Sequence, residues 1–157
     1  MNERIINSET TQVRIAFPNT LNDHETLFGG VALKWMDEVA YITATRFLRR
    51  RAVTVSIEKV RFLRPVKPDA IVELTGRVSK AGNVKIEVHV EVTTEEMYTG
   101  KKEKAIEAVF IFAAIDENHN PVRLSITETD SLHLFDSGQP VHVMKKQLLQ
   151  IQDNTKG

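Results

Sequence analysis

The feature that most constrains the fold is a change of sequence periodicity near residue 52. Between residue 31 and about residue 49, the apolar residues spread widely around a helical wheel, which predicts one long and largely buried α-helix. The segments that follow are rich in Val, Ile and Thr, and each has the length of a strand. They comprise residues 52–63, 70–82, 83–96 and 104–116. Alternating apolar and polar residues at 11–17 predict one more strand ahead of the helix.

One helix and a run of successive strands pack most simply as an α+β fold, because the helix and the apolar face of the sheet must bury each other. We therefore expect one long central helix wrapped by a five-to-six-stranded antiparallel sheet. Gly82 and Asn83 have the composition of a tight hairpin turn between two of these strands. Such a sheet leaves strand edges and one side of the helix uncovered, which predicts edge-to-edge pairing into dimers.

Length and composition predict one domain in a reducing compartment. In this chain of 157 residues, 21 Lys and Arg balance 21 Asp and Glu, which argues against a nucleic-acid binder. The absence of cysteine excludes disulfides, thiolate zinc sites and a Cys nucleophile, and fits a cytoplasmic location. No apolar run approaches the roughly 18 residues of a membrane span. We expect a single domain over residues 8–124 and a C-terminal extension over 125–157, with a short helix near 141–152 and a frayed tail.

The junction between the polar loop and the long helix carries the most promising chemistry. Asp37 lies among apolar helix neighbours, and burying a carboxylate costs several kcal/mol unless it is paired. This placement favours a general base. The alternative is that Asp37 points outward and stabilises the N-terminal half of the helix electrostatically.

Gly29 and Gly30 precede this helix, and paired glycines allow backbone conformations that other residues avoid. Their N–H groups lie at the positive end of the helix dipole, where an anion or a developing oxyanion is stabilised. Turn geometry alone also explains such a pair. Asn22 is able to orient a water or a carbonyl, but an Asn in such a loop also commonly closes an Asx-turn.

Other signatures of chemistry are missing. The histidines, at residues 24, 89, 119, 133 and 142, have no metal-ligand spacing, which predicts no metal site. The sequence also lacks the G-x-S-x-G, Walker and G-x-G-x-x-G motifs. Basic clusters indicate either a solvated face or a site for a phosphorylated ligand. They comprise Arg46, Arg49, Arg50 and Arg51; Lys59, Arg61, Arg64 and Lys67; and Lys101, Lys102 and Lys104.

Four motifs together carry a family resemblance. They are N-x6-G-G-x6-D-E-V-A from Asn22, V-T-V-S-I from Val53, F-L-R-P-V from Phe62 and K-A-x-E-A-x-F from Lys104. In order and spacing they resemble the hotdog-fold acyl-CoA thioesterases of the brain-type and bacterial acyl-CoA hydrolase family, over about residues 10–124. The resemblance implies the same architecture of one helix inside an antiparallel sheet. It also implies hydrolysis of a fatty acyl-CoA to free CoA and a carboxylate, without metal or cofactor.

The resemblance also implies roles for individual residues. Asp37 matches the catalytic carboxylate, acting as general base or nucleophile, and Asn22 matches an Asn supplied across the dimer interface. Gly30, with Gly29, matches the backbone donors that polarise the thioester carbonyl. The remaining assignments are a hydroxyl near the reacting centre (Thr54), contacts with the nucleotide or phosphates of CoA (Arg64 and Lys104) and a wall of the acyl tunnel (Phe28). Family members are dimers of hotdogs, commonly assembled as trimers of dimers, which implies a homohexamer.

Two other functions remain open from the sequence. A non-catalytic hotdog domain would use the same cavity to sense acyl-CoA, because fold does not fix function. A hotdog dehydratase usually needs a His paired with a carboxylate, and no His lies on the predicted helix beside Asp37.

Overall fold

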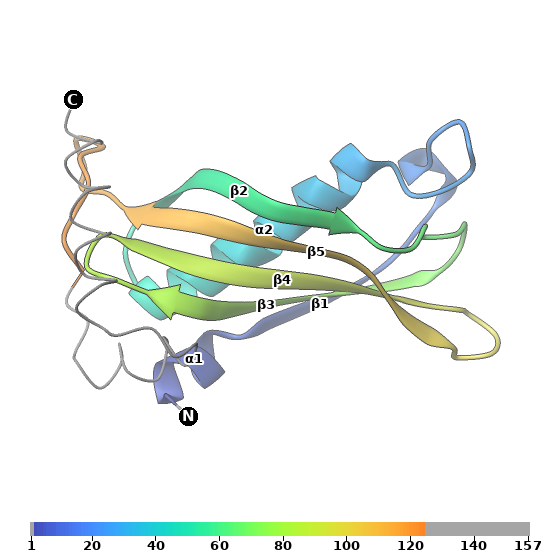
Figure 1. Ribbon diagram of the computed structural model, residues 1–157, viewed down its shortest axis with the longest axis horizontal. Coiled ribbons are helices and arrows are strands. Elements are labelled where there is room, and N and C mark those ends of the chain that lie inside the picture. The colour runs from blue at the N-terminus through green and yellow to red at the C-terminus, as the bar shows by residue number, and fades with distance from the viewer. Residues whose placement is uncertain (1, 125–157) are drawn as a thin grey trace.

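The computed structural model describes residues 2–124. One long helix, α2 (Gly29–Leu48), lies against a single antiparallel sheet of five strands (Figure 1). The strands are β1 (Thr10–Ile15), β2 (Ala52–Phe62), β3 (Ile71–Ala81), β4 (Lys85–Glu95) and β5 (Lys102–Ala114). A short helix, α1 (Glu3–Ser8), and a 3-10 turn, η1 (Pro18–Thr20), complete the elements. The predicted α+β hotdog arrangement is confirmed, with five strands.

Helix α2 is held closely against the sheet. Nine of its 20 residues are buried, including Trp35, Met36, Val39 and Phe47. Gly76 of β3 permits the close approach, since a Cβ there would lie 2.6 Å from Thr43 Oγ1. The face of α2 that carries Thr43 therefore points toward β3.

The strand order in the sheet is β1-β3-β4-β5-β2, so β1 and β2 are the edges. The predicted turn at Gly82 joins β3 to β4, with the Gly82 N–H donating to Lys85 O at 2.9 Å. The valines predicted to form the dry face of β4 are buried, among them Val88 and Val90. Their neighbours His89 and Glu91 therefore lie on the outer face, away from α2.

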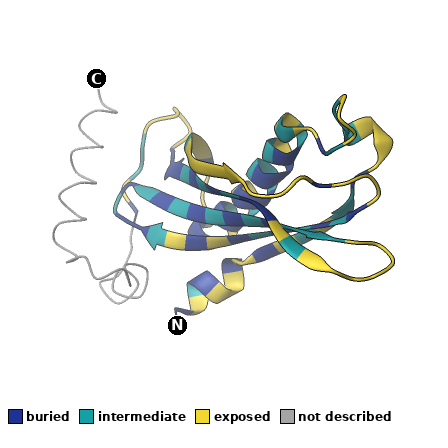
Figure 2. Cartoon of the chain, turned by 45° about the vertical axis from the view of Figure 1, so that its right-hand side comes forward, coloured by how far each residue is buried: buried dark blue, intermediate teal, exposed yellow. Residues whose placement is uncertain are grey.

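The inner strands β3 and β4 differ in burial from the edge strand β2 (Figure 2). Burial alternates along β3 and β4, whereas β2 is exposed along nearly its whole length. The register of β2 on β5 shifts twice, and Lys59 at the second shift has φ 52. The large apolar side chains exposed on or just after β2 are Val53, Val55, Ile57, Val60, Phe62 and Leu63. Such an edge is the kind that a second copy covers.

Helix α1 was not predicted, and it lies partly ahead of the domain start expected at residue 8. The Asn2 side chain caps it by accepting from the Arg4 N–H at 2.7 Å. Arg4 also donates to Phe47 O at 2.8 Å and lies 4.4 Å from the Phe47 ring centroid. These contacts dock α1 on the C-terminal part of α2.

The predicted extension over 125–157, including the short helix near 141–152, lies outside the described residues, and the domain boundaries stay a prediction. Among residues 2–124, none of the helices is both long and apolar enough to cross a membrane.

Candidate active site

Asp37 and Thr54 meet where α2 passes over the edge strand β2. The Asp37 side chain is half-buried, and Thr54 Oγ1 donates a hydrogen bond to Asp37 Oδ1 at 2.9 Å. A hydrogen bond to a carboxylate is stronger than one between neutral groups, so it fixes the orientation of the Asp37 carboxylate. Oδ2 of Asp37 has no hydrogen-bond partner among the described residues. The structure thus brings two of the predicted site residues together.

An aromatic residue that the sequence analysis missed lies beside this pair. Tyr41 is one helical turn after Asp37 and therefore on the same face of α2. Its ring centroid is 6.5 Å from that of Phe112, and Phe112 is the strand partner of Thr54. Tyr41 is 47% exposed although the Phe112 beneath it is fully buried. The spacing of four residues from Asp37 is the sequence signal that would have identified it.

Asn22 organises the loop before α2. Its Oδ1 accepts from the His24 N–H at 2.9 Å and the Thr26 N–H at 3.1 Å, while its Nδ2 donates to Thr26 Oγ1 at 2.9 Å. The Asx-turn role that the sequence left open is therefore present. It occupies the carbonyl oxygen of the side chain and one of the two amide hydrogens.

Asn22, Gly29 and Arg64 line a shared cavity of about 340 Å³ at the N-terminus of α2. No side chain caps this end of α2 at Phe28, so its first backbone N–H groups are available as donors. Phe62, which is 57% exposed, forms another wall of the cavity and packs over Gly29. The structure therefore groups three predicted residues here, separately from Asp37 and Thr54.

The prediction that Gly29 and Gly30 adopt backbone conformations that other residues avoid is wrong. Neither Gly29 nor Gly30 has a positive φ, and both belong to α2, so no unusual backbone conformation requires them. The constraint is space: a Cβ on Gly30 would lie 2.8 Å from Phe28 Cε1. Glycine at position 30 thus lets the half-exposed Phe28 ring lie directly against the start of α2.

The two groups of residues are far apart within one chain. Asp37 comes seven residues after Gly30, which corresponds to about 10 Å along the helix axis. Thr54 and Phe62 lie near opposite ends of β2, opposite Phe112 and Ile106 of β5, which are six residues apart and therefore separated by roughly 20 Å. A single thioester carbonyl therefore cannot contact both groups of the same protomer.

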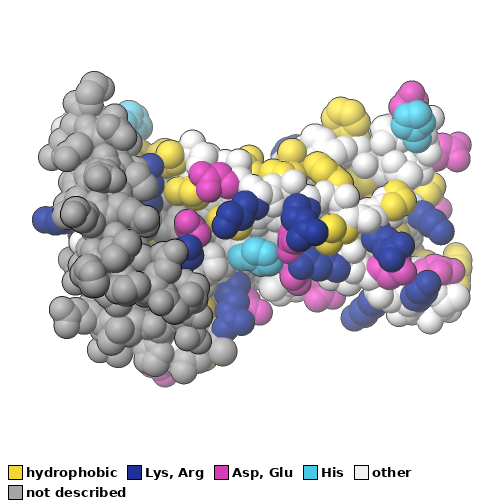
Figure 3. Space-filling view, viewed as in Figure 1, with side chains coloured by type: hydrophobic (Ala, Val, Ile, Leu, Met, Phe, Trp, Pro, Cys, Tyr) yellow, Lys and Arg dark blue, Asp and Glu magenta, His cyan; other side chains and the backbone are white. Residues whose placement is uncertain are grey.

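Lys104 lies elsewhere, on the outer face of the sheet, where charged side chains gather (Figure 3). Its Nζ is 2.9 Å from Glu91 Oε1 and 2.5 Å from Glu107 Oε2. Hydrogen bonding to Glu107, and then to Glu91, raises the pKa of the Lys104 ammonium. The same bond from Lys104 lowers the pKa of the Glu107 carboxyl. Both partners are thus stabilised in their charged forms.

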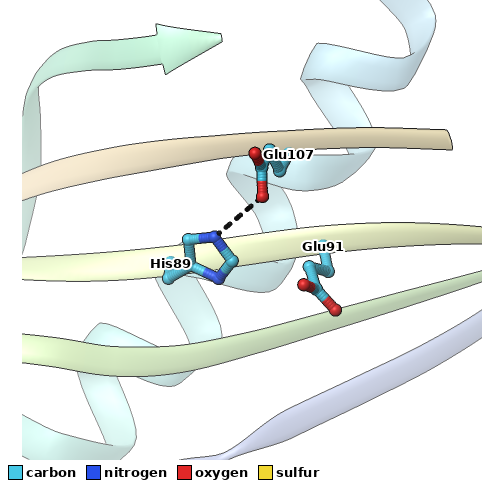
Figure 4. A group of neighbouring side chains, drawn as sticks. All are labelled: His89, Glu91 and Glu107. Atoms are coloured by element: carbon cyan, nitrogen blue, oxygen red, sulfur yellow. Dashed lines mark ion pairs between the residues drawn. The ribbon is translucent and has the colours of Figure 1, made fainter. Parts of the chain in front are cut away.

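His89, Glu91 and Glu107 form one group of possible metal ligands in the described part of the chain (Figure 4). Their ligand atoms lie within 4.8 Å of one another, and His89 Nε2 is 3.5 Å from Glu107 Oε2. Because Lys104 already binds both carboxylates, a cation would have to displace its ammonium. The arrangement is that of a surface ion-pair network.

Comparisons with known proteins identify the family of this chain. Residues 24–101 match the family model of the thioesterase superfamily. The YkhA protein of Bacillus subtilis, named an uncharacterized acyl-CoA thioester hydrolase, is 37% identical over 115 residues, covering 73% of this chain and 67% of that protein. The acyl-CoA thioester hydrolase YciA of Salmonella typhimurium is 33% identical over 115 residues, covering 71% of this chain and 86% of that protein.

A solved structure of an apo-hexameric acyl-CoA thioesterase has a TM-score of 0.76 and 27% sequence identity, with coverage of 92% of this chain and 95% of that one. The fold and the sequence relatives agree. The chain belongs to the acyl-CoA thioester hydrolases of the thioesterase superfamily, as the motifs predicted.

Proposed function

We propose that this protein hydrolyses acyl-CoA thioesters to free CoA and a carboxylate, with Asp37 as general base or nucleophile. The observation that carries the proposal is the hydrogen bond from Thr54 to Asp37 at an uncovered apolar edge of the sheet. The names of the relatives YkhA and YciA support the same substrate class.

The chemistry needs few groups, because a thioester is already activated toward attack. Thr54 holds Oδ1 of Asp37, which leaves Oδ2 either to take a proton from a water that attacks the carbonyl carbon, or to attack that carbon itself and form an anhydride that water then hydrolyses. In both routes the C–S bond breaks, and CoA leaves as the thiol with a proton that comes from water. The backbone N–H groups at the start of α2 stabilise the oxyanion that develops on the carbonyl oxygen. The free amide hydrogen of Asn22 positions the water or the carbonyl. No metal or cofactor is part of this proposal.

The separation of the two groups supports a site shared between two protomers. If two β2 strands pair antiparallel about a twofold axis, the start of one lies beside the end of the other. Thr54 and Asp37 of one protomer then approach Asn22, Gly30 and Phe62 of its partner. The exposed apolar side chains of β2 favour this edge as the interface.

The cavity beside Asn22 has the properties expected for the CoA moiety. Arg64 in its wall is mostly exposed, and its contact with Glu103 is long, 3.9 Å from Nε to Oε2, so the guanidinium is free to bind a phosphate. Lys104 as a CoA contact stays a prediction, because two carboxylates already bind its ammonium.

Higher assembly and location extend the proposal. A trimer of such dimers would give a homohexamer, and the hexameric thioesterase of similar structure supports that state. A cytoplasmic location is supported by the cysteine-free composition. Native mass spectrometry and cell fractionation test these two points.

The first test is a thiol-release assay on acyl-CoAs from acetyl to palmitoyl. Replacing Asp37 with Asn should lower kcat by about 10²–10⁴-fold, because a general base is lost while the shape is kept. Asp69→Asn is the matched control, since Asp69 is exposed and Asn tolerates its φ of 61. Wild-type turnover in Asp37→Asn would exclude the assignment. Saturable acyl-CoA binding without thiol release by wild type would favour a sensor instead.

Mixing two inactive variants tests the shared site. Asn22→Asp keeps the oxygen that accepts from His24 and Thr26 but removes the amide donor. After random reassembly of Asn22→Asp with Asp37→Asn, each mixed dimer contains one intact site, so about a quarter of wild-type activity should return. A site contained within one protomer would give no recovery.

A further inference from the structure

We propose that Tyr41 closes the acyl end of the active site and so limits the length of the acyl chain that is hydrolysed. This inference rests on the proposed function, because it assigns a role in choosing among acyl-CoA substrates.

Two observations place Tyr41 beside the reacting group: its position on α2, and a chain of contacts through Phe112 and Thr54. It lies four residues after Asp37 on the same face of α2. Its ring packs against Phe112, with centroids 6.5 Å apart, and Phe112 pairs with Thr54 across the strands. Thr54 in turn binds Asp37 at 2.9 Å. The Tyr41 ring is therefore next to the Asp37 carboxylate on the inner side of the sheet.

The direction of the substrate follows from the shared site. The CoA moiety lies toward the partner's cavity, which belongs to the N-terminal end of the partner's α2. The acyl chain then leaves Asp37 on the other side, along its own α2 toward the C-terminus. Tyr41 lies about 6 Å further along the helix axis in that direction. At 47% exposure, its ring projects into the space that a growing acyl chain would enter.

The surroundings of Tyr41 would accept a longer chain if the ring were removed. The side chains next to it are small or apolar: Ala44 is the following residue on this side of α2, and Ala52 precedes Thr54 on the inner face of β2. Phe112 forms the floor, and all three are buried in the chain. Truncating Tyr41 therefore opens an apolar groove rather than exposing polar groups.

The test compares kcat/KM over the acyl series for wild type, Tyr41→Ala and Tyr41→Phe. In Tyr41→Ala, kcat/KM for octanoyl-CoA to palmitoyl-CoA should rise about tenfold or more relative to acetyl-CoA, since additional methylenes gain apolar contact. Tyr41→Phe should keep the wild-type profile, because the ring remains. Tyr98→Ala is the matched control: Tyr98 is the other tyrosine of the chain, 96% exposed between β4 and β5.

The chain-length profile of kcat/KM tests the role of Tyr41 separately from the proposed function. An unchanged chain-length profile in an active Tyr41→Ala, or an equal loss on every substrate, would overturn the role of Tyr41. If Tyr41→Ala fails to assemble, Tyr41→Leu should show the same shift toward longer chains, and an unshifted Tyr41→Leu would overturn it. Absence of thiol release by wild type from any acyl-CoA would instead refute the proposed function itself, and this inference with it.

Discussion

Two regions of the sheet carry similar charged side chains in very different surroundings. On the outer face, Lys104 binds Glu91 and Glu107, so each charge has a partner within the chain. At the β2 edge, Asp37 has one hydrogen-bond donor, Thr54, and is bordered by exposed apolar side chains. The first region is complete in a single protomer. In the proposed function, a second protomer completes the second region, and assembly and catalysis would then use the same surface.

The largest effect is expected from a charge at the β2 edge. Ile57 is 40% exposed on β2, and Lys at this position is solvated in a free protomer but costly to bury against a partner. Ile57→Lys should dissociate the assembly and lower kcat/KM by about a hundredfold or more, because one protomer lacks a complete site. Analytical ultracentrifugation with the thiol-release assay measures both effects.

The other edge strand supplies the control for this prediction. Val13 of β1 is also an exposed apolar residue, so Val13→Lys places the same charge on the opposite edge. It should leave the assembly and the activity unchanged. Full activity in an Ile57→Lys monomer would contradict the shared site.

A smaller effect is expected when Asp37 loses its donor. Thr54→Val keeps the shape of the side chain but removes the 2.9 Å hydrogen bond to Asp37 Oδ1. A hydrogen bond to a charged group contributes about 1.5–3 kcal/mol, so kcat should fall roughly tenfold to a hundredfold. Rescue by Thr54→Ser, which restores the hydroxyl, separates this effect from a loss of packing. Equal activity of the Val and Ser variants would show that the bond has no role.

Much of the fold could be predicted because each element has a strong local pattern. The alternation along β4 and the wide apolar distribution on α2 gave their positions to within about two residues. Helix α1 was missed because it has six residues and is fixed mainly by contacts between Arg4 and Phe47, which are distant in sequence. A pattern within one segment contains no information on such contacts.

The candidate site, like the fold, could be predicted from the sequence only in part. Asp37 could be selected from its apolar neighbours, but its contact with Thr54 depends on how α2 crosses β2. The partners of Lys104 depend on the register of β4 and β5, which sets Glu91 opposite Glu107. The sequence alone shows three lysines near residue 102 and gives no sign that one of them is already paired.

The smallest effect on activity is expected on the outer face. Lys104→Gln removes the ammonium that binds Glu91 and Glu107. If this ion-pair network is only structural, KM for acyl-CoA should stay within about twofold of wild type, since Lys104 then makes no contact with the substrate and the loss of an exposed ion pair changes the stability of the fold little. Arg64→Gln is the comparison, because Arg64 lines the cavity beside Asn22 and its loss should raise KM severalfold. A severalfold rise in Lys104→Gln would instead support the predicted CoA contact.

The pH dependence of unfolding provides a second measurement on Lys104→Gln. Hydrogen bonding from Lys104 lowers the pKa of Glu107 below its ordinary 4.5. The pair of Lys104 and Glu107 therefore stabilises the fold above pH 4.5. This stabilisation is lost as the pH falls and Glu107 becomes protonated in the folded state. The raised pKa of Lys104 has the corresponding effect at high pH. Its contribution to the stability of the fold is present below pH 10.5 and is lost as alkali deprotonates the ammonium. The difference in unfolding midpoint between wild type and Lys104→Gln should therefore be largest between about pH 5 and 10 and vanish on either side. A difference that persists undiminished in acid would mean that Lys104 stabilises the sheet through packing of its alkyl chain, and not through its charge.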